Sequence, residues 1–253
     1  MADVAVVDMF SERRDEIRSY LSLLSGVEAA IRSGVPRLGA DGPTITAQQQ
    51  RILYSGVYLQ LYNLVESTIS GCLDAVSVTA LSQAARTPGD LSAKLRGEWV
   101  RHMAKTHREM GPERRLESVL GLCEHLVSAL PVSPFRIERG GGGNWDDEEI
   151  YRIATRIGFD LNLSAAAQAA VKAKIRDDKG ALALVVDLRN GLAHGRLSFV
   201  ECSQEDNVDD LTKLADRVFM YLEEVIAAFE KFVQEGLFLR IDLRPARDAV
   251  SSA

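Results

Sequence analysis

The chain has 253 residues, of which 46% are hydrophobic, and its formal net charge at pH 7 is −6. This length and hydrophobic fraction allow a sizeable buried core in one large domain or two small ones, and they exclude disorder over most of the chain. The negative net charge excludes a diffuse attraction of the whole surface to nucleic acid, so any contact with RNA must be local.

The first two predicted elements are amphipathic helices over residues 8–32 and 47–78. In the first, apolar residues recur at spacings of three and four: Ile17, Leu21, Leu24, Val27 and Ile31. Gly34 and Pro36 end this helix, and Thr46 is the expected N-cap of the second. The second keeps the helical period over its whole length, at Leu53, Val57, Leu61, Leu64, Val65, Cys72 and Leu73. Its length predicts a central core helix.

The middle of the chain predicts shorter elements. A basic stretch over residues 87–110 is followed by a helix that a proline opens, over residues 112–129. The four consecutive glycines at residues 140–143 predict a hinge, because they have no side chains to pack. A helix that begins with four carboxylates is expected over residues 146–156, and an alanine-rich helix over residues 164–176.

Two further helices are predicted over residues 179–194 and 208–235. The second has a continuous apolar stripe, formed by Leu211, Leu214, Val218, Leu222, Val225, Phe229 and Phe232. We expect these two helices to pack antiparallel across the loop of residues 195–207. The long stretches rich in Ala, Leu, Glu and Arg predict an all-α fold.

The cysteines and the N-terminal segment bear on the cellular compartment. Cys72, Cys123 and Cys202 form no C-x-x-C pair, which argues against a zinc ribbon or a dithiol redox site and fits a reducing compartment. Residues 1–10 have no basic n-region, and no apolar run approaches the roughly 20 residues needed to span a bilayer. We therefore expect a cytoplasmic protein without a membrane partner.

Residues 187–195 read D-L-R-N-G-L-A-H-G, which places Arg189 and His194 in an R-x4-H pattern with Asn190 directly after the arginine. The pattern resembles the R-x(4 to 6)-H motif of HEPN ribonucleases. The longer run R-N-G-L-A-H-G-R-L-S-F resembles a bacterial branch of that superfamily, which is met in toxin and phage-defence loci. Residues 59–69, L-Q-L-Y-N-L-V-E-S-T-I, resemble the first core helix of the same branch.

The resemblance implies an all-α, HEPN-type antiparallel helical bundle with additional helices, in one domain over residues 1–253. The core is then expected from residues 45–78, 113–130 and 178–235, accompanied by the N-terminal helix 8–32 and a middle insertion at 80–160. The resemblance also implies a homodimer in which two motifs face each other and cut RNA without metal or cofactor. Further partners would be an antitoxin or a neighbouring defence protein. The alternative is a non-catalytic HEPN module that binds a nucleotide or a partner protein.

The chemistry of the motif is compatible with RNA cleavage. Arg189 offers a planar fork that binds phosphate oxygens and stabilises the transition state. His194 lies in the last turn of its helix, where the helix dipole favours the imidazolium, and it is the candidate for proton transfer. Cleavage needs both a base and an acid, so a second copy of His194 from a partner subunit would complete the site. Arg189 lies roughly 140° around an ideal helix from His194, so local distortion or the partner must bring them together.

The supporting residues have two interpretations each. Asn190 shares a helix face with His194 and would orient either the imidazole or a phosphate oxygen. Glu66 either orients Arg189 as a buried ion-pair partner or is a solvated carboxylate, and Tyr62, one turn earlier, is either a site residue or simply core.

Two other charged segments are candidate binding sites. Arg101, Lys105 and Arg108 either form a surface that binds RNA or belong to a solvated helix face whose charge nearby glutamates dilute. The carboxylates of residues 146–149 suit a helix N-terminus without any metal, so no metal site is expected.

Overall fold

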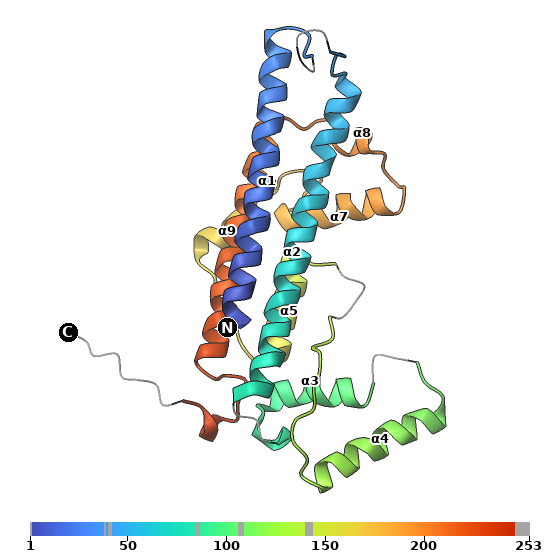
Figure 1. Ribbon diagram of the computed structural model, residues 1–253, viewed down its shortest axis with the longest axis vertical. Coiled ribbons are helices and arrows are strands. Elements are labelled where there is room, and N and C mark those ends of the chain that lie inside the picture. Colours follow the sequence, from blue (N-terminus) through green and yellow to red (C-terminus); the bar gives the residue numbers. More distant parts are fainter. Residues whose placement is uncertain are drawn as a thin grey trace, which may run out of the picture.

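The computed structural model describes residues 2–37, 39, 42–83, 87–105, 109–139 and 144–245, and over these residues the fold is all-helical (Figure 1). The α-helices of this described part are α1 (Ala2–Ser33), α2 (Ala47–Gln83), α3 (Ala93–Met103), α4 (Pro112–Val127), α5 (Asp147–Ile157), α6 (Ala165–Lys172), α7 (Ala181–Ala193), α8 (Phe199–Cys202) and α9 (Val208–Gln234). A 3-10 helix, Pro88–Asp90, lies between α2 and α3, and another, Ile241–Leu243, follows α9. The predicted fold class is therefore confirmed, whereas the predicted hinge at 140–143 lies outside the described residues.

Several of the helices begin where a short polar side chain accepts a hydrogen bond from a free backbone N–H group, whereas α4 and α7 begin after a glycine. Thr46 caps α2 as predicted, because its hydroxyl accepts from the Gln49 N–H at 3.1 Å. Asp146 caps α5, with its carboxylate 2.8 Å from the Glu149 nitrogen, and Asn207 caps α9. These caps explain why α2, α5 and α9 begin within one residue of their predicted starts, whereas α1 begins six residues before its predicted start.

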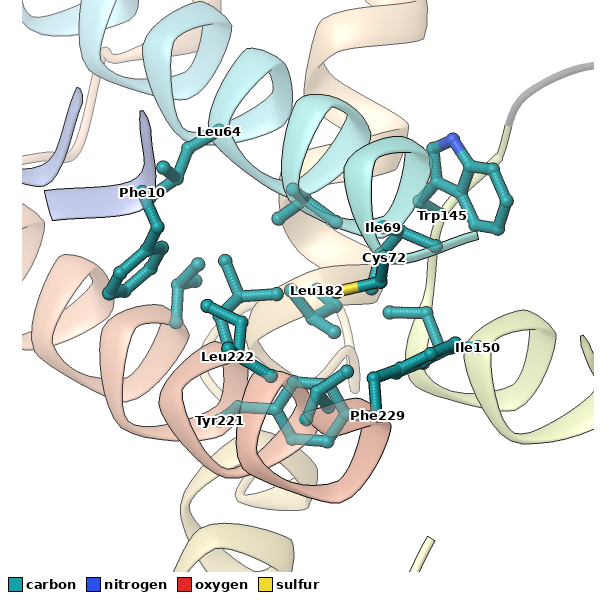
Figure 2. Packing of buried hydrophobic residues seen from close by; sticks show 14 of the residues in the cluster. Phe10, Leu64, Ile69, Cys72, Trp145, Ile150, Leu182, Tyr221, Leu222 and Phe229 are labelled. Atoms are coloured by element: carbon teal, nitrogen blue, oxygen red, sulfur yellow. The ribbon is translucent and has the colours of Figure 1, made fainter. Parts of the chain in front are cut away.

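Three long helices, α1, α2 and α9, form the body of the protein. α1 runs antiparallel to both α2 and α9, so α2 and α9 run in the same direction (Figure 1). Figure 2 shows the core between them, where Leu64, Ile69 and Cys72 of α2 face apolar side chains of α9. On the surface, Arg14 of α1 donates to Glu223 of α9 at 2.9 Å.

The prediction of which helices form the core is wrong at two places. The helix at 113–130 was expected in the core, but α4 has no buried residue and lies beside α3, away from the bundle (Figure 1). The N-terminal helix was expected outside the core, but α1 packs along α2 and α9 and buries Phe10 and Leu24. An amphipathic pattern indicates that a helix has an apolar face, but it does not indicate which element covers that face.

α7, which contains the motif, lies across the long helices and packs mainly on α2 (Figure 1). The prediction that it packs antiparallel to the last helix is therefore wrong. The reason lies in the connection, because residues 195–207 contain the short helix α8, which also packs on α2. Leu182, Leu184 and Val185 of α7 are each about 1% exposed, so the N-terminal half of α7 is anchored in the core.

By length and composition α2 is apolar enough to cross a membrane, contrary to the expectation that no stretch of this chain reaches that limit. In the described structure, 67% of its most apolar window is buried inside the protein. A central core helix passes the same test, because its neighbours cover it on most sides.

Candidate active site

The motif lies where α7 ends. Arg189 and Asn190 occupy the last turns of α7, and His194 is its C-cap, with a backbone N–H that donates to the Asn190 carbonyl at 3.0 Å. Gly195 follows with φ of +68°, a left-handed conformation that glycine adopts without strain. The sequence prediction that this glycine ends the helix is confirmed.

Arg189 is held in place by two contacts. Its guanidinium carbon lies 4.2 Å from the centroid of the Tyr62 ring on α2, a close cation–π geometry. Its Nη1 donates to the Asn190 side-chain oxygen at 2.9 Å. Arg189 as a whole is half-buried, and these two contacts fix the direction of its guanidinium.

Tyr62 is both a core residue and a contact of the site, so its two interpretations are not exclusive. It is 1% exposed, and burial raises the pKa of its phenol; the charge of Glu66 raises it further, and Arg189 opposes the shift. The ring therefore stays neutral at ordinary pH beneath the guanidinium. Glu66 is half-buried, and no ion pair joins it to Arg189 in the part of the chain that the structure describes.

Asn190 connects the motif to a residue that sequence reasoning missed. Its side-chain nitrogen donates to the side-chain oxygen of Asn144 at 2.9 Å. Asn144 is exposed, but the next residue, Trp145, is 1% exposed and anchors this segment in the core (Figure 2). The Asn190 amide therefore lies between Arg189 and Asn144, and it makes no hydrogen bond to the imidazole of His194. Nothing in the local sequence around Asn144 indicated this contact, since 46 residues separate the two asparagines.

The chain folds back against α7 directly after the motif. Arg196 donates through Nη2 to the Asp187 carboxylate at 2.6 Å and to the Asp187 carbonyl at 3.1 Å, and the Leu197 N–H donates to the Gly191 carbonyl at 3.0 Å. A Cβ at Gly191 would lie 2.8 Å from a Leu197 methyl carbon, so any other residue here would force the end of the Leu197 side chain to shift. The fold-back fixes the position of the turn that presents His194.

Asp187 is the centre of this fold-back, because Lys179 also donates to its carboxylate at 2.7 Å. Burial raises the pKa of Asp187, but the hydrogen bonds from Lys179 and Arg196 outweigh burial and hold the pKa below its ordinary value. A depressed carboxylate pKa stabilises the fold above the unfolded-state pKa, and this stabilisation is lost as the pH falls through the folded-state pKa.

We expect Asp187→Asn to lower the free energy of unfolding by on the order of 1 kcal/mol at pH 7, the usual range for a partly exposed ion-pair network. Denaturant titrations of both proteins should show that the difference shrinks below about pH 4, near the pKa of an unfolded aspartate. A difference that stays constant down to pH 2 would show that the charge of Asp187 is not what stabilises the turn.

His194 is exposed, and its imidazole makes no hydrogen bond or ion pair within the described residues. No contact between Arg189 and His194 is formed inside one chain either. The structure therefore brings Arg189, Asn190 and Tyr62 together, and it places His194 one helical turn after Asn190, exposed at the surface.

The predicted RNA-binding residues on α3 lie elsewhere. Figure 1 shows α3 beyond the lower end of the bundle, well separated from α7. Arg101 pairs with the buried carboxylate of Glu98 at 3.2 Å, whereas Lys105 is exposed, and Arg108 lies outside the described residues. Glu98 also pairs with Arg156 of α5 at 3.1 Å, so part of this charged segment joins α3 to α5.

Glu98 supports a stability prediction, because its side chain is 2% exposed and its partner Arg156 is 15% exposed. Burial raises the pKa of Glu98, and its two arginine neighbours oppose that shift. We expect Glu98→Ala to lower the free energy of unfolding by about 3 kcal/mol, because Arg156 would be left buried without its partner. Chemical denaturation checks this. The double variant Glu98→Leu with Arg156→Leu should lose less free energy of unfolding than Glu98→Ala. A larger loss in the double variant would contradict the argument.

The acidic run at 146–149 is explained by helix structure. Asp146 is the N-cap of α5, and Glu149 accepts a hydrogen bond from Arg152 Nε at 2.7 Å. Within the described ranges, no three His, Cys, Asp or Glu side chains are grouped so that they could hold a metal ion.

Comparison with known proteins identifies the family. Residues 5–238 match the family model described as MAE_28990-like HEPN. The comparisons with curated proteins and with solved structures gave no match. Because the family model covers nearly the whole chain, the chain belongs to this HEPN family, and HEPN domains are commonly ribonucleases.

Proposed function

We propose that this HEPN protein is a metal-independent endoribonuclease of a toxin–antitoxin or phage-defence system, which cuts RNA through Arg189, Asn190 and His194 at the cleft of a homodimer. The proposal rests on the contacts and exposure of the motif side chains at the end of α7. The guanidinium of Arg189 is already held by Tyr62 and Asn190, and His194, five residues later at the end of the same helix, is exposed.

The reaction that suits these groups is attack by the 2′-hydroxyl of a ribose on the adjacent phosphorus. A base removes the proton of the 2′-hydroxyl, the 2′-oxygen bonds to phosphorus, and the bond to the 5′-oxygen breaks as an acid protonates it. The products are a 2′,3′-cyclic phosphate and a 5′-hydroxyl end. Arg189 would stabilise the negative charge that develops on the phosphoryl oxygens, since a held cation needs no reorganisation when the charge appears.

A homodimer supplies the second proton-transfer group. One imidazole cannot be both the base and the acid in a single step, and no other histidine lies near the end of α7 in the described part of the chain. A two-fold symmetric contact at this surface would place two copies of His194 across one cleft, where one accepts a proton and the other donates it.

The regulatory setting belongs to the same proposal. A ribonuclease of this kind would act in the cytoplasm on cellular or phage RNA, and an antitoxin or a neighbouring defence protein would hold it inactive until a trigger. The three cysteines, which form no disulfide within the described structure, suit a reducing compartment.

The test is an RNA cleavage assay with the purified protein in the presence of EDTA. The expected result is cleavage that EDTA does not abolish, with products that end in a 2′,3′-cyclic phosphate. Cleavage only after magnesium is added would overturn the metal-independent mechanism. Binding of RNA or of a nucleotide without any cleavage, together with harmless expression in a bacterial host, would instead support a non-catalytic HEPN module.

A further inference from the structure

A second candidate binding site lies between α5, α6 and α9, apart from the motif. It is a cavity of about 280 Å³ whose lining includes both apolar and charged side chains. Leu161, Leu163 and Val171 supply apolar surface, Tyr221 of α9 and Tyr151 of α5 supply aromatic groups, and Asp147, Glu148, Gln168 and Lys172 supply polar groups. None of these residues is part of the R-x4-H motif.

Tyr221 is the most informative residue in this cavity. It projects from α9 within the packed cluster of Figure 2 and is only 2% exposed, yet its hydroxyl makes no hydrogen bond within the described residues. The ring is buried, but the hydroxyl oxygen is not among the fully buried unpaired atoms of the described residues, so it opens onto the cavity, where a water or a ligand is its partner. Because Tyr221 lines the cavity, a bound molecule could provide that partner.

The charges around the cavity indicate the sign of that molecule. Asp147 and Glu148 line it, and neither forms an ion pair or side-chain hydrogen bond within the described ranges. Lys172 contributes one positive charge against these two negative ones. The carboxylates also lie close enough to Tyr221 to act on it: burial raises the pKa of its phenol, and the charges of Asp147 and Asp146 raise it further. The phenol therefore stays neutral, and its oxygen can accept a hydrogen bond.

The start of helix α5 alone does not explain why two carboxylates, a tyrosine hydroxyl without a protein partner and apolar side chains line one cavity. Asp147 and Glu148 lie in the first turn of α5, where carboxylates suit the helix dipole. That effect does not account for an unpartnered tyrosine hydroxyl or for a cavity with an apolar side. A hard divalent cation is disfavoured as well, because such ions require several oxygen ligands and the described residues contain no group of three suitable side chains.

We propose that this cavity binds an organic cation, a primary ammonium or a guanidinium on a short aliphatic chain. The carboxylates of Asp147 and Glu148 would bind the cation by charge-assisted hydrogen bonds, and the exposed ring of Tyr151 would contribute a cation–π contact. The aliphatic part would lie against the leucines and the valine, and the Tyr221 oxygen would accept a hydrogen bond from the cationic N–H.

The size of the cavity limits the ligand. Pockets for drug-sized ligands and cofactors occupy roughly 300–1,000 Å³, and this cavity is at the lower end of that range at about 280 Å³. A small free amine or a single lysine or arginine side chain of another protein fits this volume. Both sources have the same chemistry at the cationic end.

The test is isothermal titration calorimetry of the full chain with agmatine and cadaverine, and with 1-pentanol as a neutral analogue of similar length. We expect saturable binding of at least one amine and none of 1-pentanol. The double variant Asp147→Asn with Glu148→Gln should weaken amine binding at least about tenfold, the loss of one good charge-assisted contact or more. Tyr221→Phe, which keeps the ring, should weaken it a few fold.

Asp216→Asn is the matched control, because Asp216 is an exposed acidic residue on α9 outside the cavity and should leave binding unchanged. Thermal melting of each variant verifies that the fold is retained. No saturable amine binding, or equal weakening by the cavity variants and by Asp216→Asn, would overturn the proposal.

A peptide comparison separates the two sources of the cation. If a lysine- or arginine-containing peptide binds at least tenfold more tightly than the free amines, the natural source is a partner's side chain; the reverse order indicates a free amine. Because these measurements detect binding alone, they do not depend on the proposed ribonuclease activity.

Discussion

Replacing His194 by alanine is expected to reduce the rate of RNA cleavage by about 10²–10⁴-fold, the usual range for the loss of a general acid–base group. The side chain is exposed and makes no hydrogen bond or ion pair within the described residues. The melting temperature should therefore stay close to that of the wild type, and the loss should be confined to the chemical step. A gel assay with a labelled RNA, read at several enzyme concentrations, measures the rate.

Mixing subunits tests whether the two histidines act together. If one cleft uses His194 from both chains, a mixed dimer with one alanine is inactive. Activity per wild-type subunit should then fall toward about one half when equal amounts of wild-type and His194→Ala protein are exchanged. Unchanged activity per wild-type subunit would show that each chain cuts alone and would remove the dimer cleft from the mechanism. Full cleavage by His194→Ala alone would remove His194 from it.

Replacing Arg189 by lysine is expected to reduce cleavage by about 10²–10³-fold, although the charge is kept. A lysine ammonium lacks the planar fork that stacks on Tyr62 and donates to Asn190, so it would not be held in the observed direction. We expect Arg189→Ala to be no more than modestly worse than Arg189→Lys. The measurement is the same cleavage assay under saturating RNA, so that a loss in binding is separated from a loss in rate.

Two further variants test whether the loss of cleavage in Arg189→Lys comes from the geometry of the motif. Tyr62→Phe keeps the aromatic ring beneath the guanidinium and should retain most of the activity, because the cation–π contact does not require the hydroxyl. Arg32→Lys, an exposed position on α1, is the matched control for an arginine replaced outside the motif. Wild-type cleavage by Arg189→Lys would show that only the charge at this position matters and not the geometry at the end of α7.

The amino-acid sequence alone determined the helices and the position of the motif. The apolar period of α2 and α9 is continuous, and caps such as Thr46 are encoded by neighbouring residues. The placement of His194 and Gly195 at the end of α7 also follows from local sequence, since a glycine at this point ends a helix. Interactions within a few residues of each other control these features, so a linear pattern is enough to predict them.

Only the tertiary structure decided which helices meet and which side chains hold the motif. α4 and α1 are both amphipathic, yet α1 is in the core and α4 is not. The contacts of Arg189 with Tyr62 and of Asn190 with Asn144 join segments that are far apart in the chain. The physical reason is that the period of a helix specifies the direction of its apolar face, whereas the partner of that face depends on how the whole chain excludes water most completely.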